Sequence, residues 1–122
     1  MPSIIVKQPN KAPFQMNLRD GQFTLELLQR LVNGHIEVVH PDGMPEGVVL
    51  ICNEEGKLND MLFNFYVEIC GWPDAICGTC VFCAEGVNEF GEPDLVPLKF
   101  DQVVSVMVAL SGVSEQSTKT NH

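Results

Sequence analysis

Proline and glycine recur along this chain and mark the turns between its strands and helices. The clearest helical segment lies between Thr24 and Gly34, because its apolar residues recur at helical spacing, at Leu25, Leu28, Leu31 and Val32. Thr24 can cap the start of this helix, and Gly34 can end it in a left-handed conformation. The sequence therefore predicts an amphipathic helix here.

Short segments rich in branched residues predict two β-hairpins. The first joins Ser3–Lys7 to Phe14–Leu18 through the turn sequence QPNKAP. The second joins Ile36–Val39 to Val48–Cys52 through PDGMPEG. A further strand is predicted over Ile76–Ala84, so antiparallel strands are expected to make up most of the fold.

Two later segments remain open between helix and strand. Residues 62–69 fit either, and the sequence Trp72-Pro73-Asp74 is expected to end them. In the last apolar segment, strand-like alternation is seen at Val104, Val106, Val108 and Leu110. A single helical face is formed there by Phe100, Val103, Val104, Met107 and Leu110.

A chain of 122 residues with 45% hydrophobic content fits one domain with one core. We expect an α+β domain over residues 3–110, with a small, mostly antiparallel sheet of about five strands and two or three helices packed on one side. Residues 111–122 are polar, and we expect them to form a mobile tail.

The negative charge of the chain is concentrated in its middle. The formal net charge is -9, but residues 37–101 alone contain 13 Asp and Glu residues against two lysines, Lys57 and Lys99, a net charge of -11. Such a field repels phosphate backbones, so direct binding of nucleic acid is not expected. A basic protein partner, or a role as a DNA mimic, is electrostatically allowed.

The expected location is the cytoplasm. No apolar run reaches the roughly 18 to 20 residues that cross a bilayer, and MPSIIVKQPNKAP lacks the features of a secretion signal. The five cysteines form an odd set without such a signal, which favours reduced thiols.

Cys77, Cys80 and Cys83 form two overlapping C-x-x-C spacings, which are typical of zinc or iron–sulfur ligands. Three thiolates leave a metal short of a fourth ligand. On one strand Cys80 would also point away from the other two. We therefore expect buried, inert cysteines and no cofactor, with a metal site at these three residues as the alternative.

The segment Asn53-Glu54-Glu55-Gly56 has the composition of a turn in which Asn53 bonds the backbone two residues on and Gly56 takes a left-handed conformation. A phosphate-binding site at Gly56-Lys57 is the alternative. It lacks the glycine-rich run and the following Ser or Thr of a P-loop, and two carboxylates would face the phosphate. The sequence favours a turn.

Four blocks carry a resemblance to known proteins: KAPFQMNL, LELLQRLVNGHIEVVHP, VVLICNEEGKLN and DAICGTCVFCA. Over about residues 3–110 the chain resembles proteins of phages, plasmids and integrative elements that form domain-of-unknown-function family thirty-eight forty-six. Residues 53–58 match the signature of that family. The resemblance implies an α+β domain and a helical last element, and it implies no established activity. Relatives carry an Asn-Arg pair after the signature, whereas this chain has Asn64 and Phe65.

Three functions follow as hypotheses, and no catalytic residue is predicted. The first is a non-catalytic accessory protein of a phage or mobile element that binds and modulates a host protein through an acidic surface. The second is an acidic DNA mimic that opposes restriction, and the third is a protein that binds or sequesters a nucleotide-like ligand. The candidate interaction residues are Asn53, Glu54, Glu55, Gly56, Lys57 and Asn64. The apolar segment 103–110 is a candidate homodimer contact.

Overall fold

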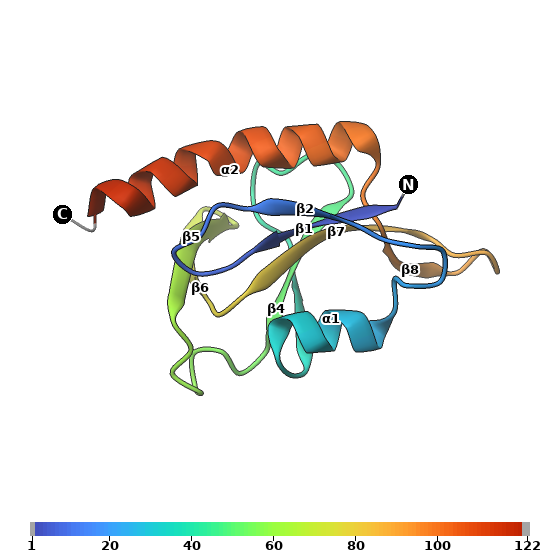
Figure 1. The fold of residues 1–122 in the computed structure, drawn as a ribbon, viewed down its shortest axis with the longest axis horizontal. Coiled ribbons are helices and arrows are strands. Elements are labelled where there is room, and N and C mark those ends of the chain that lie inside the picture. Colours follow the sequence, from blue (N-terminus) through green and yellow to red (C-terminus); the bar gives the residue numbers. More distant parts are fainter. Residues whose placement is uncertain (1, 121–122) are drawn as a thin grey trace.

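The computed structural model describes residues 2–120, and it describes side chains as far as residue 111. This part of the chain forms an α+β fold in which every strand pairing is antiparallel (Figure 1). The elements are β1 (Ser3–Lys7), β2 (Phe14–Asn17), α1 (Leu25–Val32), β3 (Ile36–Val39), β4 (Val48–Asn53), β5 (Phe63–Ile69), β6 (Trp72–Cys77), β7 (Cys80–Val87), β8 (Pro93–Val96) and α2 (Phe100–Thr120).

Strand β7 is the centre of the main sheet, whose order is β2-β1-β7-β4-β3. One edge of β7 pairs with β4, for example at Leu50↔Phe82. Its other edge pairs first with β1, at Lys7↔Cys80, and then with β8, at Ala84↔Val96. Both predicted hairpins are confirmed, because β1 pairs with β2 and β3 pairs with β4.

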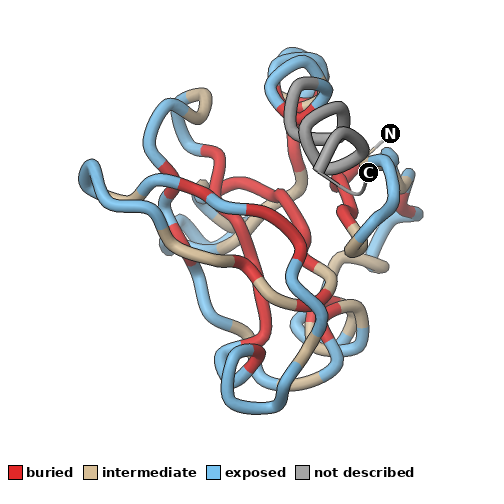
Figure 2. The backbone as a smooth tube through the Cα atoms, turned by 90° about the vertical axis from the view of Figure 1, so that its left-hand side faces the viewer, coloured by how far each residue is buried: buried red, intermediate tan, exposed pale blue. Residues whose placement is uncertain are grey.

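The two helices cover opposite faces of this sheet. Leu28 and Val32 of α1 pack on one face, and Val103, Val106 and Leu110 of α2 pack on the other. The expectation that the helices lie on one side is therefore wrong. The physical reason is that every residue of β1 and β4 and the first five residues of β7 are buried, so both faces of these strands need a cover. Figure 2 shows such buried backbone running through the middle of the molecule.

Strands β5 and β6 form a separate two-stranded sheet. Its buried residues, Phe65, Val67 and Ile76, join the core on the α2 side of the main sheet. The hairpin turn is Cys70-Gly71, and both residues have positive φ (51° and 82°), as in the turns that suit two-residue hairpin loops. The Asp42 carboxylate accepts hydrogen bonds from both of their backbone N–H groups, at 3.1 and 2.8 Å.

The sequence was misleading in the second half of the fold. Residues 62–69 are mostly strand, and Trp72-Pro73-Asp74 continues as β6 instead of ending the segment. Pro73 is exposed on a two-stranded sheet, where a missing N–H is tolerated. The strand predicted over residues 76–84 is divided between β6 and β7 at Gly78, which has φ 82°.

The predicted capping of α1 and the helical last element are confirmed, and the predicted end of α1 is not. The Thr24 side chain caps α1 by accepting a hydrogen bond from Leu27 N at 3.1 Å. The left-handed residue at the end of α1 is Asn33 (φ 63°), whose side chain tolerates that conformation, and not the expected Gly34. The last apolar segment is helical, as the resemblance implied.

Helix α2 runs to Thr120, and residues 121–122 lie outside the described residues. The expectation of a mobile tail over residues 111–122 stays a prediction. Within the described residues, no helix combines the length and the apolar character needed to cross a membrane.

Candidate functional site

The side chain of Asn53, the first residue of the signature, joins three parts of the backbone. Its Nδ2 donates to the backbone oxygens of Val32 (3.1 Å) and Asn33 (3.0 Å), at the end of α1. Its Oδ1 accepts from Glu55 N at 2.7 Å, which is the predicted bond to the backbone two residues on. Asn53 is buried, and these bonds use both polar atoms of its side-chain amide. Asn53 therefore has a structural role: it fixes the loop after β4 to the end of α1.

Gly34 and Gly56 are needed because other atoms approach them closely. A Cβ on Gly34 would lie 2.5 Å from Asn53 Nδ2, and a Cβ on Gly56 would lie 2.9 Å from the backbone oxygen of Cys77. The predicted left-handed conformation of Gly56 is wrong, since the positive φ of this loop belongs to Asp60 (φ 53°). Gly56 lets the loop lie against β6.

Lys57 is already paired. Its Nζ donates to the Asp74 carboxylate on β6, and both side chains are exposed. These two residues line a concavity of about 310 Å³ together with Glu37, Cys52, Asn53, Glu54, Gly56, Leu58, Ala75, Ile76 and Cys77. Glu55 is exposed and does not line this concavity. Three carboxylates around one paired ammonium oppose a phosphate at this position.

Asn64 lies apart from the rest of the signature, in the core beside Lys7. Asn64 Nδ2 donates to the backbone oxygens of Lys7 (2.8 Å) and Gly78 (2.9 Å). In return, Asn64 Oδ1 accepts from Lys7 Nζ at 2.9 Å. Asn64 and residues 53–57 were predicted to belong to one interaction site, and the structure does not bring them together.

Lys7 is a buried lysine held by neutral groups. Its side chain is 1% exposed, and its Nζ also donates to the backbone oxygen of Gln8 at 2.8 Å and lies 6.0 Å from the centroid of the Phe65 ring. Burial lowers the pKa of this ammonium below the usual value for lysine. Sequence reasoning missed Lys7, and the one available signal was a charged residue at the end of an apolar strand.

The cysteines are spread over the two faces of the main sheet. Cys80 and Cys83 belong to β7 and lie in the core clusters of opposite faces, as predicted, while Cys77 is on β6. Burial raises the pKa of Cys52 and of Cys83 to about 12, and it raises the pKa of Cys80 as well. Among the described residues, no group of three or more His, Cys, Asp or Glu side chains is placed to hold a metal ion.

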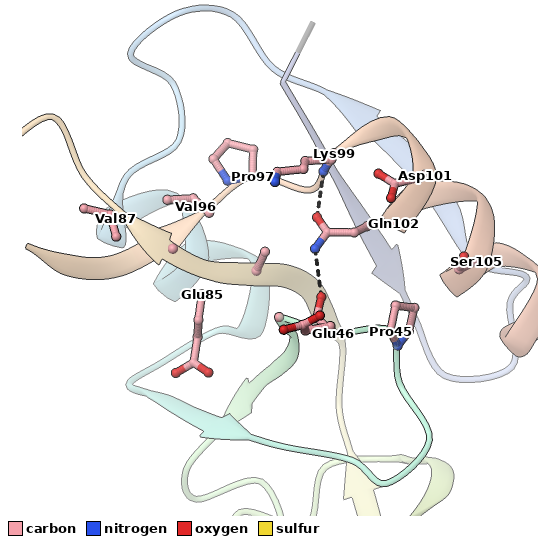
Figure 3. Close-up of a pocket in the computed structure, with 13 residues that line it drawn as sticks. Pro45, Glu46, Glu85, Val87, Val96, Pro97, Lys99, Asp101, Gln102 and Ser105 are labelled. Atoms are coloured by element: carbon pink, nitrogen blue, oxygen red, sulfur yellow. Dashed lines mark hydrogen bonds between the residues drawn. The ribbon is translucent and has the colours of Figure 1, made fainter. Parts of the chain in front are cut away.

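A concavity of about 810 Å³ lies between the start of α2, the β7–β8 pair and the connection before β4 (Figure 3). Its walls carry three carboxylates, Glu46, Glu85 and Asp101, and one ammonium, Lys99. Apolar contacts are offered by Pro45, Ala84, Val87, Val96 and Pro97. We call this hollow the acidic concavity.

Gln102 holds two walls of the acidic concavity together, as the dashed lines in Figure 3 show. Its Oε1 accepts from Lys99 N at 2.8 Å, and its Nε2 donates to the backbone oxygen of Glu46 at 3.1 Å. On another wall, the Glu85 carboxylate lies 3.0 Å from His40 Nε2. The side chains of Glu46 and Asp101 have no hydrogen bond within the described part of the chain, so their charges are available to a ligand.

Comparison with known proteins gives one match. The family described as Domain of unknown function (DUF3846) matches residues 2–101, which is most of the chain. No curated protein and no solved structure matches.

Proposed function

Because the chain belongs to the family of unknown function DUF3846, which supplies no activity, we propose from the geometry that it is a non-catalytic protein that binds a basic segment of another protein in its acidic concavity. In the setting of a phage or mobile element, which the resemblance implies, that partner is a host protein whose activity is modulated by the contact.

The observation that supports this proposal is the excess of carboxylates in the acidic concavity. Glu46, Glu85 and Asp101 face one lysine there, within a chain whose formal net charge is -9. A concavity lined by one sign of charge raises the local concentration of the opposite charge and speeds association with it. The concavity therefore suits an arginine or lysine side chain.

The apolar walls support the same class of ligand. Lysine and arginine carry long apolar stems below their charged ends, and such stems pack well on apolar surfaces. Pro45, Val87 and Val96 supply this kind of surface beside the carboxylates. The volume of about 810 Å³ accommodates a few side chains of a peptide and lies in the range of ordinary ligand sites.

A nucleotide-like ligand at the signature receives less support. The smaller concavity at the signature presents Glu37, Glu54 and Asp74, and its lysine is already paired with Asp74. A phosphate would have to displace that pair and then remain beside the other carboxylates. The geometry favours the acidic concavity as the binding site.

The experiment compares two triple variants of equal charge in fluorescence anisotropy with a labelled arginine-rich peptide. Glu46→Gln, Glu85→Gln and Asp101→Asn remove the carboxylates of the acidic concavity. Glu54→Gln, Glu55→Gln and Asp60→Asn remove three exposed carboxylates from the signature loop. We expect the first variant to lose about tenfold or more in affinity and the second to lose about twofold or less. Equal losses in both variants would contradict the proposal, since they would show attraction by net charge alone.

A further inference from the structure

Two buried cysteines stand opposite each other at the centre of the main sheet. In the register of β4 and β7, the pair that follows Ile51↔Val81 is Cys52 and Cys80. Both belong to the core cluster on the α2 side of the sheet, so their side chains point to the same face. Both are free thiols. Side chains that stand directly opposite each other on one sheet face contact each other, so the two sulfurs are neighbours.

The hydrogen bonds between β4 and β7 fix how close this pair comes. Glu85 N donates to Gly47 O at 2.8 Å, which makes these two residues a hydrogen-bonded pair. Hydrogen-bonded and non-hydrogen-bonded pairs alternate along antiparallel strands, so Cys52 and Cys80 form a non-hydrogen-bonded pair. The Cα atoms of such pairs lie about 4.5 Å apart, the closer of the two spacings. This spacing lies at the short end of the range of about 4.4 to 6.8 Å that a disulfide bridges.

Charged residues flank the two cysteines in the neighbouring strands. Lys7 of β1 stands opposite Cys80, and Glu37 of β3 stands opposite Cys52. Cys52 Sγ donates to Glu37 Oε1 at 3.7 Å. Burial raises the pKa of both thiols, and the proximity of Cys52 raises the pKa of Cys80 further. A disulfide has no proton to lose, so its formation removes two poorly solvated titratable groups from the core.

The other cysteines are less well placed for a bond to either of these two. Cys83 belongs to the core cluster on the α1 side, so the sheet separates it from them. Cys77 is partly exposed and lies on β6, outside the main sheet. Cys70 lies in the turn of the β5–β6 hairpin and is exposed. The strand register therefore selects the pair across β4 and β7.

We propose that Cys52 and Cys80 form a reversible cross-strand disulfide that makes the fold sensitive to redox conditions. The oxidant is a small disulfide such as oxidised glutathione. The Cys52 thiolate attacks one of its sulfurs, forms a mixed disulfide and releases one glutathione thiolate. The Cys80 thiolate then attacks Cys52 Sγ, and the second glutathione thiolate leaves. The two protein thiol protons pass to these thiolates, so two protein thiols are oxidised and one glutathione disulfide is reduced.

The surroundings of the pair set the order of attack and the effect of the bond. Cys52 is 5% exposed and lines the concavity at the signature, whereas Cys80 is 0% exposed. The β5–β6 sheet covers the pair, and Asn64 Nδ2 donates to Cys80 Sγ at 3.9 Å. Exchange therefore takes place while the chain folds or when this sheet opens. The bond closes a loop over residues 52–80, which contains the signature loop and the β5–β6 sheet. The switch does not depend on the proposed peptide site.

Refolding in glutathione buffers, followed by tryptic digestion, tests the pairing. Trypsin cuts after Arg30, Lys57 and Lys99, which places Cys52 on residues 31–57 and the other cysteines on residues 58–99. Wild-type protein is unfolded in urea with dithiothreitol and then diluted into native buffer. We expect a disulfide that joins these two peptides, with a yield that rises with the share of oxidised glutathione and returns to zero in dithiothreitol. Absence of the joined peptides at every glutathione ratio would overturn the proposal.

Matched variants identify the partner of Cys52. Cys80→Ala should abolish the joined peptides, and Cys77→Ala should leave their yield as in the wild type. Persistence of the joined peptides in Cys80→Ala would overturn the proposal. Oxidation of the wild type in concentrated urea does not rely on the fold of any variant. It should favour bonds within residues 70–83, because short loops close more readily. A yield of joined peptides in urea equal to that in native buffer would overturn the proposal as well.

Urea unfolding of the oxidised and reduced wild type tests the effect on the fold. Closing the loop over residues 52–80 restricts the unfolded chain, so the unfolding equilibrium constant of the oxidised form should be lower by about tenfold or more. An oxidised form with an unchanged or lower urea midpoint would show that the bond does not lock the fold, and it would overturn that part of the proposal.

Discussion

The Nδ2 atom of Asn53 lies 3.0 Å from the backbone oxygen of Asn33, so the first residue of the signature holds the end of helix α1. Asn33 is the left-handed residue that ends this helix, and its carbonyl has no partner within the helix. The signature is thus a structural junction between α1, β4 and β6. We propose that ligand recognition takes place elsewhere, in the acidic concavity.

Replacing Asn53 by alanine should destabilise the protein by about 1 to 3 kcal/mol, because the buried backbone oxygen of Val32 and the partly buried hydrogen bond to Asn33 O lose their donor. Asn53→Asp should cost more, since it places a carboxylate against the negative end of α1. Urea unfolding measures both. The exposed neighbour Glu54→Ala is the control and should change stability by less than about 0.5 kcal/mol. An Asn53→Ala variant as stable as the control would refute the structural role.

Gly56→Ala should destabilise the protein through a steric contact with the backbone of β6, at 2.9 Å from Cys77 O. Backbone cannot move aside cheaply, so we expect a loss of about 1 to 3 kcal/mol in urea unfolding. Gly86→Ala is a matched control, because its new Cβ would meet a methyl group of Val96 at the same 2.9 Å, and a side chain yields more readily than backbone. A smaller loss for Gly56→Ala than for Gly86→Ala would be inconsistent with this explanation.

The burial of Lys7 predicts how the stability of the protein changes at alkaline pH. Its folded-state pKa is lowered by burial, so the folded state disfavours the charged form, and this penalty disappears as the pH rises toward the unfolded value of 10.5. Compared with Lys7→Met, the wild type should therefore gain stability between neutral pH and about pH 10. Urea unfolding of both proteins at the two pH values gives the difference. If the stability of the wild type relative to Lys7→Met stayed constant or fell between neutral pH and about pH 10, the lowered pKa of Lys7 would be contradicted.

The thiols should react in the order of their burial. Cys70 is exposed and should react first with a maleimide, Cys77 should follow, and the buried Cys52, Cys80 and Cys83 should react only on unfolding. Mass spectrometry of digests taken over time identifies each site. Early modification of Cys80 or Cys83 would show that the sheet opens more easily than its burial implies.

The buried thiols of Cys52 and Cys83 should lower the stability of the fold at high pH. The pKa of Cys52 and of Cys83 is raised to about 12, from 9.0 as the unfolded reference, so the unfolded state loses its protons first. The contribution of these two thiols to the free energy of unfolding is complete below about pH 9. It is lost between about pH 9 and pH 12. Replacing Cys83 by alanine should reduce this alkaline loss of stability in urea unfolding, and an unchanged loss would be evidence against it.

Features with a local cause could be predicted from the sequence. The capping of α1 by Thr24 and the bond from Glu55 N to Asn53 depend on neighbours in the chain, and both were predicted. The opposite placement of the helices follows from the consecutive apolar residues of β4 and β7, because such strands need a cover on both faces.

Features that depend on topology could not be predicted. Glu46, Glu85 and Asp101 come from distant parts of the chain and meet because β7 lies between β4 and β8 and because α2 starts directly after β8. The excess of acidic residues over 37–101 indicated a charged surface, but it did not indicate which carboxylates share a hollow. Pro73 likewise has a strand role only because β6 belongs to a two-stranded sheet.

The most direct test of the central claim is nuclear magnetic resonance of the ¹⁵N-labelled protein during titration with an arginine-rich peptide. The account predicts that the amide signals of Gly47, Gly86 and Gln102 in the acidic concavity shift with a common affinity, and that these shifts weaken as salt rises. Signals of Glu54 and Lys57 in the signature loop should stay in place. Shifts centred on the signature loop, or spread evenly over all acidic residues, would contradict the account.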